Sequence, residues 1–256
     1  MKPALPEALR PRFSGSKVGA LMSTRAGGVS QGRFDSLNLG SAVGDEPLRV
    51  AENRTRFAAA LGGQPVYLRQ VHGRGVVRLE AHAPEQAPEA DACVTTVAGV
   101  ACVVQVADCL PVLLAAPGGR GVAAAHAGWL GLAAGVLDAT VVALCEAAAC
   151  APAQLQAWLG PCIGPRRFEV GADVLAGFGL APDGVHRRFV PHAAGKWLAD
   201  LAGLARDRLE GLGLSQIDGG SWCTVEDASR FFSFRRDRPV HGNSGRMAAA
   251  IWIERG

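Results

Sequence analysis

The central segment of the sequence is VACVVQVADCLPVLLAAPGGRGVAAAHAGW, residues 100–129. Three runs in it, 100–106, 111–116 and 121–126, are apolar almost throughout and are separated by short segments that contain Asp, Cys, Pro and Gly. Strands with one face in water alternate between apolar and polar residues, whereas continuous apolar runs of this length are typical of strands covered on both faces. We therefore expect these runs to be buried strands.

Outward from this stretch, the chain alternates between strand and helix signals. Further strands are predicted at 17–24, 65–71, 75–80 and 92–97, and a final pair at 231–237 and 245–253. One helix begins near Asp45, a favourable N-cap residue followed by Pro47, and ends at the Gly-Gly pair 62–63. Segments rich in Ala, Leu and Val predict two more helices, at 130–150 and 196–211.

The composition is that of one folded domain. With 256 residues, 49% of them hydrophobic and 19% charged, the chain is long enough to bury a large core and too apolar to be disordered. We expect an N-terminal tail, residues 1–16, followed by a single domain, residues 17–256. The net charge is only +3 and the basic residues are scattered, which argues against a nucleic-acid partner.

The sequence also predicts a cytoplasmic protein without a membrane anchor. The N-terminal segment MKPALPEALRPRF lacks the apolar core of a signal peptide. The most apolar run, residues 136–150, is interrupted by Asp138 and Glu146 and is too short to span a bilayer. The seven cysteines are odd in number and dispersed, so we expect reduced thiols rather than a disulfide framework.

Three good metal ligands each follow an apolar run: His72 in RQVHG, Cys109 in ADCLP and His126 in AHAGW. We expect each to lie where a buried strand ends and its loop begins, so that the three can meet in space. Two imidazoles and a thiolate form a set that binds zinc and leaves a fourth position for water or substrate. Their spacing matches no short zinc signature such as CxxC or HExxH, so the prediction of a catalytic metal site depends on all three together.

Polar groups suited to holding a substrate occur in two Gly-rich loops, RAGGVSQGRFDSLNLG at 25–40 and the basic segment that precedes the last apolar run. Glycine neighbours allow the backbone to approach a ligand closely. Guanidinium groups bind phosphate bidentately. The candidate substrate contacts are Arg25, Arg33, Asn38 and Arg246.

Other chemistries fit the same residues. Two histidines, a cysteine and a distant methionine also describe a Cu2+ electron-transfer site, but a multicopper oxidase needs more histidines than the six in this chain. Cys109 with His126 as its base would make a cysteine-nucleophile hydrolase. A binding or quality-control protein with little turnover is a third alternative.

Taken together, these segments resemble the laccase-domain family, also called polyphenol oxidase or YfiH-like proteins. The resemblance runs in order along nearly the whole chain, through STRAGGVSQGRFDSLNLG, RQVHG, DACVT, ADCLPVLL, HAGWLGLAAGV, LGPCIGPRRFEVG, FFSFRRD and GRMAAAIW. It implies an α+β fold, a four-layer α/β/β/α sandwich, and a zinc ion on the residues that match His72, Cys109 and His126.

The resemblance also implies purine nucleosides and phosphate as substrates, with phosphorolysis of adenosine, inosine and S-methyl-5′-thioadenosine, and adenosine deamination as a further activity. In bacteria the family is linked to editing of peptidoglycan precursors. This sequence departs from the family pattern HAGWRG, because Leu130 stands where the family has arginine. We expect Arg25, Arg33 or Arg246 to supply the missing positive charge.

Overall fold

The computed structural model describes residues 5–15, 17–81 and 84–255 and confirms a mixed α+β fold. At its centre, the stretch 100–129 forms β5 (Val100–Val106), β6 (Leu110–Ala115) and β7 (Val122–Ala127). Nearly all side chains of these three strands are buried, as predicted. β6 and β7 pair antiparallel, whereas β5 belongs to a second sheet.

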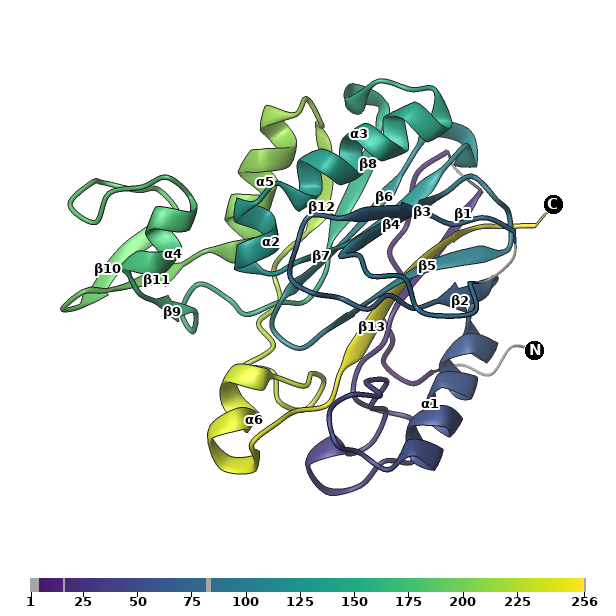
Figure 1. Ribbon diagram of the computed structural model, residues 1–256, viewed down its shortest axis with the longest axis horizontal. Helices are drawn as coiled ribbons and strands as arrows, with labels where there is room; N and C mark the ends of the chain where they lie inside the picture. Colours follow the sequence, from purple (N-terminus) through teal and green to yellow (C-terminus); the bar gives the residue numbers. More distant parts are fainter. Residues whose placement is uncertain (1–4, 16, 82–83, 256) are drawn as a thin grey trace.

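Two sheets form the body of the protein (Figure 1). One has six strands in the order β12-β8-β6-β7-β4-β3, and the other has four in the order β1-β13-β5-β2. The remaining strands of the six-stranded sheet are β3 (Val76–Arg78), β4 (Ala92–Thr95), β8 (Gln156–Leu159) and β12 (Gln216–Gly219). Those of the four-stranded sheet are β1 (Val18–Met22), β2 (Gln64–Val66) and β13 (Met247–Ile253).

Apolar clusters join the sheets to each other and to the helices. Side chains of both sheets, such as Val104 and Leu113, pack in one cluster between them. α1 (Pro47–Ala60) covers the other face of the four-stranded sheet. α3 (Val136–Ala148) and α5 (Leu201–Gly211) cover the other face of the six-stranded sheet. Removal of these apolar surfaces from water is the main stabilising contribution to the fold.

A third sheet projects from this body (Figure 1). It contains β9 (Glu169–Val170), β10 (Phe189–Ala193) and β11 (Lys196–Ala199), and α4 (Ala172–Gly177) lies beside it. The prediction of one helix over 196–211 is therefore wrong in its first part. α5 begins after its N-cap Asp200, whose carboxylate accepts a hydrogen bond from the Gly203 N–H, so residues 196–199 are left free to pair in the sheet.

The pair of strands predicted near the end of the chain is half wrong. GRMAAAIWI contains β13, but FFSFRRD leads into α6 (Phe234–His241). The aromatic residues favour a strand. The Ser233 hydroxyl nevertheless caps a helix here by accepting a hydrogen bond from the Arg236 N–H.

The apolar helix predicted over 130–150 is interrupted. α2 (Trp129–Ala133) is separated from α3 by Gly135, whose φ of 90° is left-handed. Glu46, rather than Asp45, occupies the N-cap position of α1, and its side chain makes no capping hydrogen bond. Three 3-10 turns complete the described elements: Gly32–Phe34, Pro117–Gly119 and Pro152–Gln154.

The N-terminal segment packs on the domain. Residues 1–4 and 16 of the predicted tail lie outside the described residues, but Leu9 and Met22 exchange two backbone hydrogen bonds of 2.9 Å. Leu5 and Phe13 are buried. Within the described part of the chain, no helix is both long enough and apolar enough to cross a membrane.

Candidate metal centre

The three predicted ligands meet at one point. Their ligand atoms all lie within 4.8 Å of one another, and Cys109 Sγ lies 3.8 Å from His72 Nε2. The two imidazole rings are edge to face, with their centroids 4.8 Å apart. His72 is exposed, Cys109 is half-buried and His126 is buried, so the group opens toward solvent on the His72 side. This group could hold a metal ion.

The ligands reach this point differently from the prediction that each ends a strand. His72 lies in the loop beyond β2, Cys109 stands directly before β6, and only His126 is near a strand end, within β7. The antiparallel register of β6 and β7 places Leu110 opposite Ala127, which brings Cys109 beside His126. The β2–β3 loop then carries His72 across to them.

The backbone around the centre adopts conformations that are unfavourable elsewhere. His72 has a φ of 60° and Asp108 a φ of 90°, in the left-handed region that non-glycine residues rarely occupy. Gly128 leaves room for the ligands, because a Cβ atom there would lie 3.0 Å from Cys109 Sγ and 3.1 Å from His72 Cδ2. The three side chains can therefore lie close together because of the left-handed backbone at His72 and Asp108 and the missing side chain at Gly128.

Two buried aspartates hold the ligand loops. Asp91 accepts hydrogen bonds from three successive backbone N–H groups, those of residues 71–73, and from His126 Nδ1. Asp108 accepts from the Thr224 hydroxyl at 2.5 Å and from the Arg235 N–H at 2.6 Å. Asp91 thus connects two ligands, and Asp108 connects the Cys109 loop to the start of α6.

The pKa values reflect this packing. Burial alone would raise the pKa of the Cys109 thiol, but the two imidazoles outweigh it and lower the pKa to about 6. Burial likewise disfavours His126 in its charged form, but Cys109 and Asp91 raise the pKa of this imidazole to about 9. For Asp91, the bonds from His126 and the backbone outweigh burial and lower the pKa of the carboxyl. The site therefore stabilises a thiolate.

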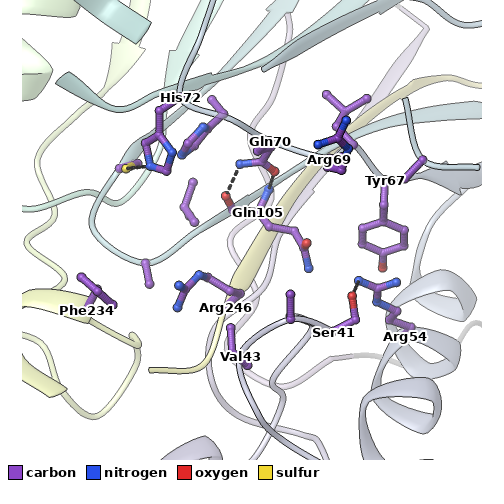
Figure 2. Close-up of a pocket in the computed structure, with 18 residues that line it drawn as sticks. Ser41, Val43, Arg54, Tyr67, Arg69, Gln70, His72, Gln105, Phe234 and Arg246 are labelled. Atoms are coloured by element: carbon purple, nitrogen blue, oxygen red, sulfur yellow. Dashed lines mark hydrogen bonds between the residues drawn. The ribbon is translucent and has the colours of Figure 1, made fainter. Parts of the chain in front are cut away.

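The triad lines a cavity of about 590 Å³, a size typical of small-molecule pockets. Figure 2 shows its two ends: His72, Phe234 and Arg246 toward one, and Tyr67 and Arg54 at the other. Between them, the Gln70 amide donates to Gln105 O at 2.8 Å and accepts from Gln105 N–H at 2.7 Å. These paired bonds fix the segment that carries His72 against β5.

Arg246 is the predicted substrate contact that lines the cavity together with the triad. One nitrogen of its guanidinium donates to Ser244 O at 2.7 Å, and its Cζ lies 5.6 Å from the centroid of the Phe234 ring. Nε and Nη2 have no acceptor among the described residues. Burial lowers the pKa of this guanidinium from its ordinary value. It is a fixed, partly desolvated cation with donors left for a ligand.

The other predicted contacts lie outside the cavity wall. Arg25 donates to the carbonyl groups of Asp35 and Ala228, and Arg33 donates to that of His241. Both arginines therefore hold loops together.

Asn38 is fully buried, and its Oδ1 accepts from the backbone N–H groups of Gly40 and Arg246. Asn38 therefore fixes the backbone of Arg246 through this hydrogen bond. Leu130, where the resemblance leads us to expect arginine, is half-exposed on α2 and is not part of the cavity wall.

Sequence reasoning missed two groups that shape the site, Asp91 and Phe234. Asp91 carried a signal, because a carboxylate directly before an apolar strand such as 92–97 is costly to bury without partners. Phe234 carried none, since FFSFRRD indicated a strand. The residue lines the cavity because Ser233 begins a helix there.

A family model described as multi-copper polyphenol oxidoreductase laccase matches residues 19–254, nearly the whole chain. The chain belongs to this laccase family. The resemblance seen in the sequence is thereby confirmed.

Relatives of this laccase-family protein carry a different functional name. The purine nucleoside phosphorylase of Pseudomonas aeruginosa is 46% identical over 240 residues, which cover 93% of this chain and 95% of that protein. The purine nucleoside phosphorylase YfiH of Escherichia coli is 47% identical over 238 residues, which cover 92% and 94%. The crystal structure of a Neisseria meningitidis protein is 43% identical, covers 97% of this chain and 99% of its own, and has a TM-score of 0.89.

The metal-binding potential of this laccase-family chain is concentrated in one place. Among residues 5–15, 17–81 and 84–255, His72, Cys109 and His126 are the one group of three or more potential ligands close enough to share an ion. His82 lies outside the described residues. Such a single group suits one metal ion rather than the several ions of a multicopper oxidase.

Proposed function

We propose that this protein is a purine nucleoside phosphorylase that binds zinc through His72, Cys109 and His126. Its relatives at 46% and 47% identity bear that name along nearly their full length. The observation that carries the proposal is the cavity, where this ligand triad and the fixed guanidinium of Arg246 line the same space.

The proposed metal is zinc because of the donor set. Two imidazole nitrogens and a thiolate with a pKa of about 6 are ligands that zinc prefers, and three protein ligands leave a position open. The hydrogen bond from His126 Nδ1 to Asp91 leaves Nε2 of that ring as the nitrogen available for a metal. Zinc bound there would supply a Lewis acid that polarises an oxygen atom beside it.

Phosphorolysis exchanges one bond for another at the anomeric carbon of the nucleoside. The C1′–N bond to the base breaks, a C1′–O bond to phosphate forms, and the base leaves with the bonding electrons and takes up a proton. The protein must therefore hold an anion against the sugar and hold a flat aromatic base beside it.

Arg246 and Phe234 suit these two tasks. The guanidinium has free donors and is anchored through Ser244, so it can hold phosphate without reorganising. The Phe234 ring lines the cavity beside Arg246 and supplies an aromatic surface that a purine can contact. Arg246 thereby supplies the positive charge that Leu130 cannot.

We propose, as the finer description of the fold, that residues 17–256 form one laccase-type domain with a four-layer α/β/β/α core. The packing of α1 on one sheet, and of α3 and α5 on the other, supports this description. The projecting sheet of β9, β10 and β11 is an addition to it.

The test combines metal analysis of the purified protein with a substrate screen. Adenosine, inosine and S-methyl-5′-thioadenosine are each incubated with and without phosphate, and the release of free base is followed. We expect about one zinc ion per chain and base release that requires phosphate. Release of base at the same rate without phosphate would contradict the proposal, and inosine formed from adenosine would identify deamination as a further activity.

A second candidate, a hydrolase with Cys109 as nucleophile, is favoured by one observation. The thiol has a lowered pKa of about 6 and an imidazole nitrogen 3.8 Å away. Iodoacetamide distinguishes the two, because a zinc-bound thiolate is protected. Rapid alkylation of Cys109 in zinc-loaded protein, with loss of activity, would support the hydrolase.

A further inference from the structure

Among the residues that the structure describes, Asp91 has no charged partner other than an imidazole, although it is fully buried. A buried carboxylate is costly unless several donors satisfy it. Here four donors do so. Oδ1 accepts from His72 N–H at 2.9 Å and from His126 Nδ1 at 2.8 Å, and Oδ2 accepts from the N–H groups of Val71 and Gly73. One oxygen atom thus contacts both histidine ligands.

The contact with His126 determines which nitrogen of that ring can bind a metal. When Nδ1 carries the proton and donates it to Asp91, the lone pair is on Nε2. The backbone adds a second connection, because His126 N–H donates to Asp91 O at 2.7 Å. Ring and backbone of this ligand are therefore both held by one residue.

The contact with the 71–73 loop holds the backbone that carries the other imidazole. The φ of 60° at His72 is unfavourable for a residue with a side chain, so the loop needs compensating interactions to keep it. Three N–H groups that converge on one carboxylate provide them. Without this anchor, His72 would lose its fixed distance from Cys109.

We propose that Asp91 is the positioning residue of the metal centre, a single carboxylate that sets the orientation of both imidazoles relative to each other. The inference rests on the proposed zinc site but not on nucleoside turnover.

The test uses zinc affinity as its readout. Zinc-free protein is titrated with zinc against a chelating indicator, and a parallel sample is titrated with Co2+ to record its visible spectrum. Asp91→Asn keeps the size of the side chain but places an amide NH2 group against donors. We expect the zinc Kd to rise by about 10- to 100-fold and the cobalt band to shift.

Asp207→Asn is the matched control. Asp207 accepts two hydrogen bonds from Arg188 far from the centre, so its loss should lower Tm and leave the zinc Kd unchanged. An Asp91→Asn protein with lowered Tm but unchanged zinc Kd and cobalt spectrum would show that Asp91 only supports the fold. Wild-type protein that binds no zinc would instead overturn the proposed metal site.

A measurement on wild-type protein covers the case in which Asp91→Asn does not fold. Nitrogen NMR of zinc-free protein reports which ring nitrogen of His126 is protonated. In the neutral ring we expect the proton on Nδ1, because this nitrogen faces Asp91 Oδ1 at 2.8 Å. A neutral ring protonated on Nε2 would overturn the proposal.

Discussion

At Gly128, a single hydrogen atom in place of a side chain allows the ligands to close on one another. A Cβ atom there would meet Cys109 Sγ at 3.0 Å and His72 Cδ2 at 3.1 Å. We expect Gly128→Ala to push the two ligands apart and weaken zinc binding about tenfold to a hundredfold, as measured by chelator competition. Gly211→Ala is the control, since nothing lies within 4 Å of a Cβ atom there. Equal zinc affinities in the two variants would contradict this account of the centre.

Arg246 is the residue on which phosphate binding should depend. Loss of a charge-assisted, bidentate contact costs about 2 to 3 kcal/mol, so Arg246→Ala should raise the KM for phosphate by roughly 30- to 150-fold. The KM for the nucleoside should change much less. Steady-state kinetics with each substrate varied in turn provide the measurement.

Arg69→Ala is the comparison variant for this prediction. Arg69 also lines the cavity but is largely exposed and pairs with Glu89, so we expect less than about a threefold change in either KM. If Arg69→Ala has the larger effect on phosphate, the anion binds at the other end of the cavity.

A substitution at Leu130 tests whether Arg246 alone supplies enough positive charge to bind phosphate. Since Leu130 lies outside the cavity wall, we expect Leu130→Arg to leave the KM for phosphate within about threefold of wild type. A hundredfold increase in phosphorolysis through a lower phosphate KM would show that the charge is missing in this protein. The same kinetic assay decides it.

Among the elements, α6 links the cavity to the loop that carries Cys109. Its first residue, Phe234, lines the cavity, and the Arg235 N–H donates to Asp108. Ser233 accepts from Arg236 N–H, and the next residue, Phe234, lines the cavity. We expect Ser233→Ala to lower the free energy of unfolding by about 1 kcal/mol, measured by urea denaturation, because a capping bond is lost. The nucleoside KM should rise as the Phe234 ring loses its fixed position. An unchanged urea midpoint would contradict the role of the cap.

The elements that sequence reasoning predicted best are those with one dominant signal. Continuous apolar runs identified β5, β6 and β7, and the Gly-Gly pair ended α1 near the right place. The failures come from residues whose local preference competes with a distant or capping interaction. Phe231 and Phe232 favour a strand, and Leu198 fits the apolar face of a helix but pairs with Glu169 in the third sheet.

Sequence reasoning selected the three residues that meet in the candidate metal group, but not the residues that support them. His72, Cys109 and His126 were recognised because few residue types bind soft metals. Asp91 was not, because its role depends on the loop conformation at residues 71–73, which no local pattern specifies. Arg25 and Arg33 were selected for their charge and for the Gly-rich loop that carries them, and only the fold shows that each guanidinium donates to backbone carbonyl groups.

For the whole molecule, we expect the packing of the third sheet against α5 to depend on pH. Arg188, next to β10, donates to Asp207 on α5 at 2.6 and 2.8 Å and to Asp200 at 2.9 Å. The bonds from Arg188, together with its charge, lower the pKa of Asp207 below its ordinary value of 3.8. A carboxyl group with a lowered folded-state pKa stabilises the protein above that ordinary value and loses this contribution as pH falls through the folded-state pKa.

We therefore expect the amide hydrogens of residues 165–200 to exchange faster below about pH 4. The two main sheets should lose their protection only at lower pH. Asp207→Asn should show the same increase already at pH 7, with a loss of about 1 kcal/mol. Hydrogen exchange read by mass spectrometry makes the comparison. Simultaneous exchange of the whole chain would contradict it.

The place of β13 in its sheet has a consequence for synthesis in the cell. β13 lies between β1 and β5, yet the ribosome makes it long after both (Figure 1). Until it emerges, β1 has no strand to pair with and β5 exposes one unpaired edge, the kind of surface that chaperones cover. Arg246 stands directly before β13. A nascent chain therefore places this guanidinium in the cavity only when β13 inserts between β1 and β5.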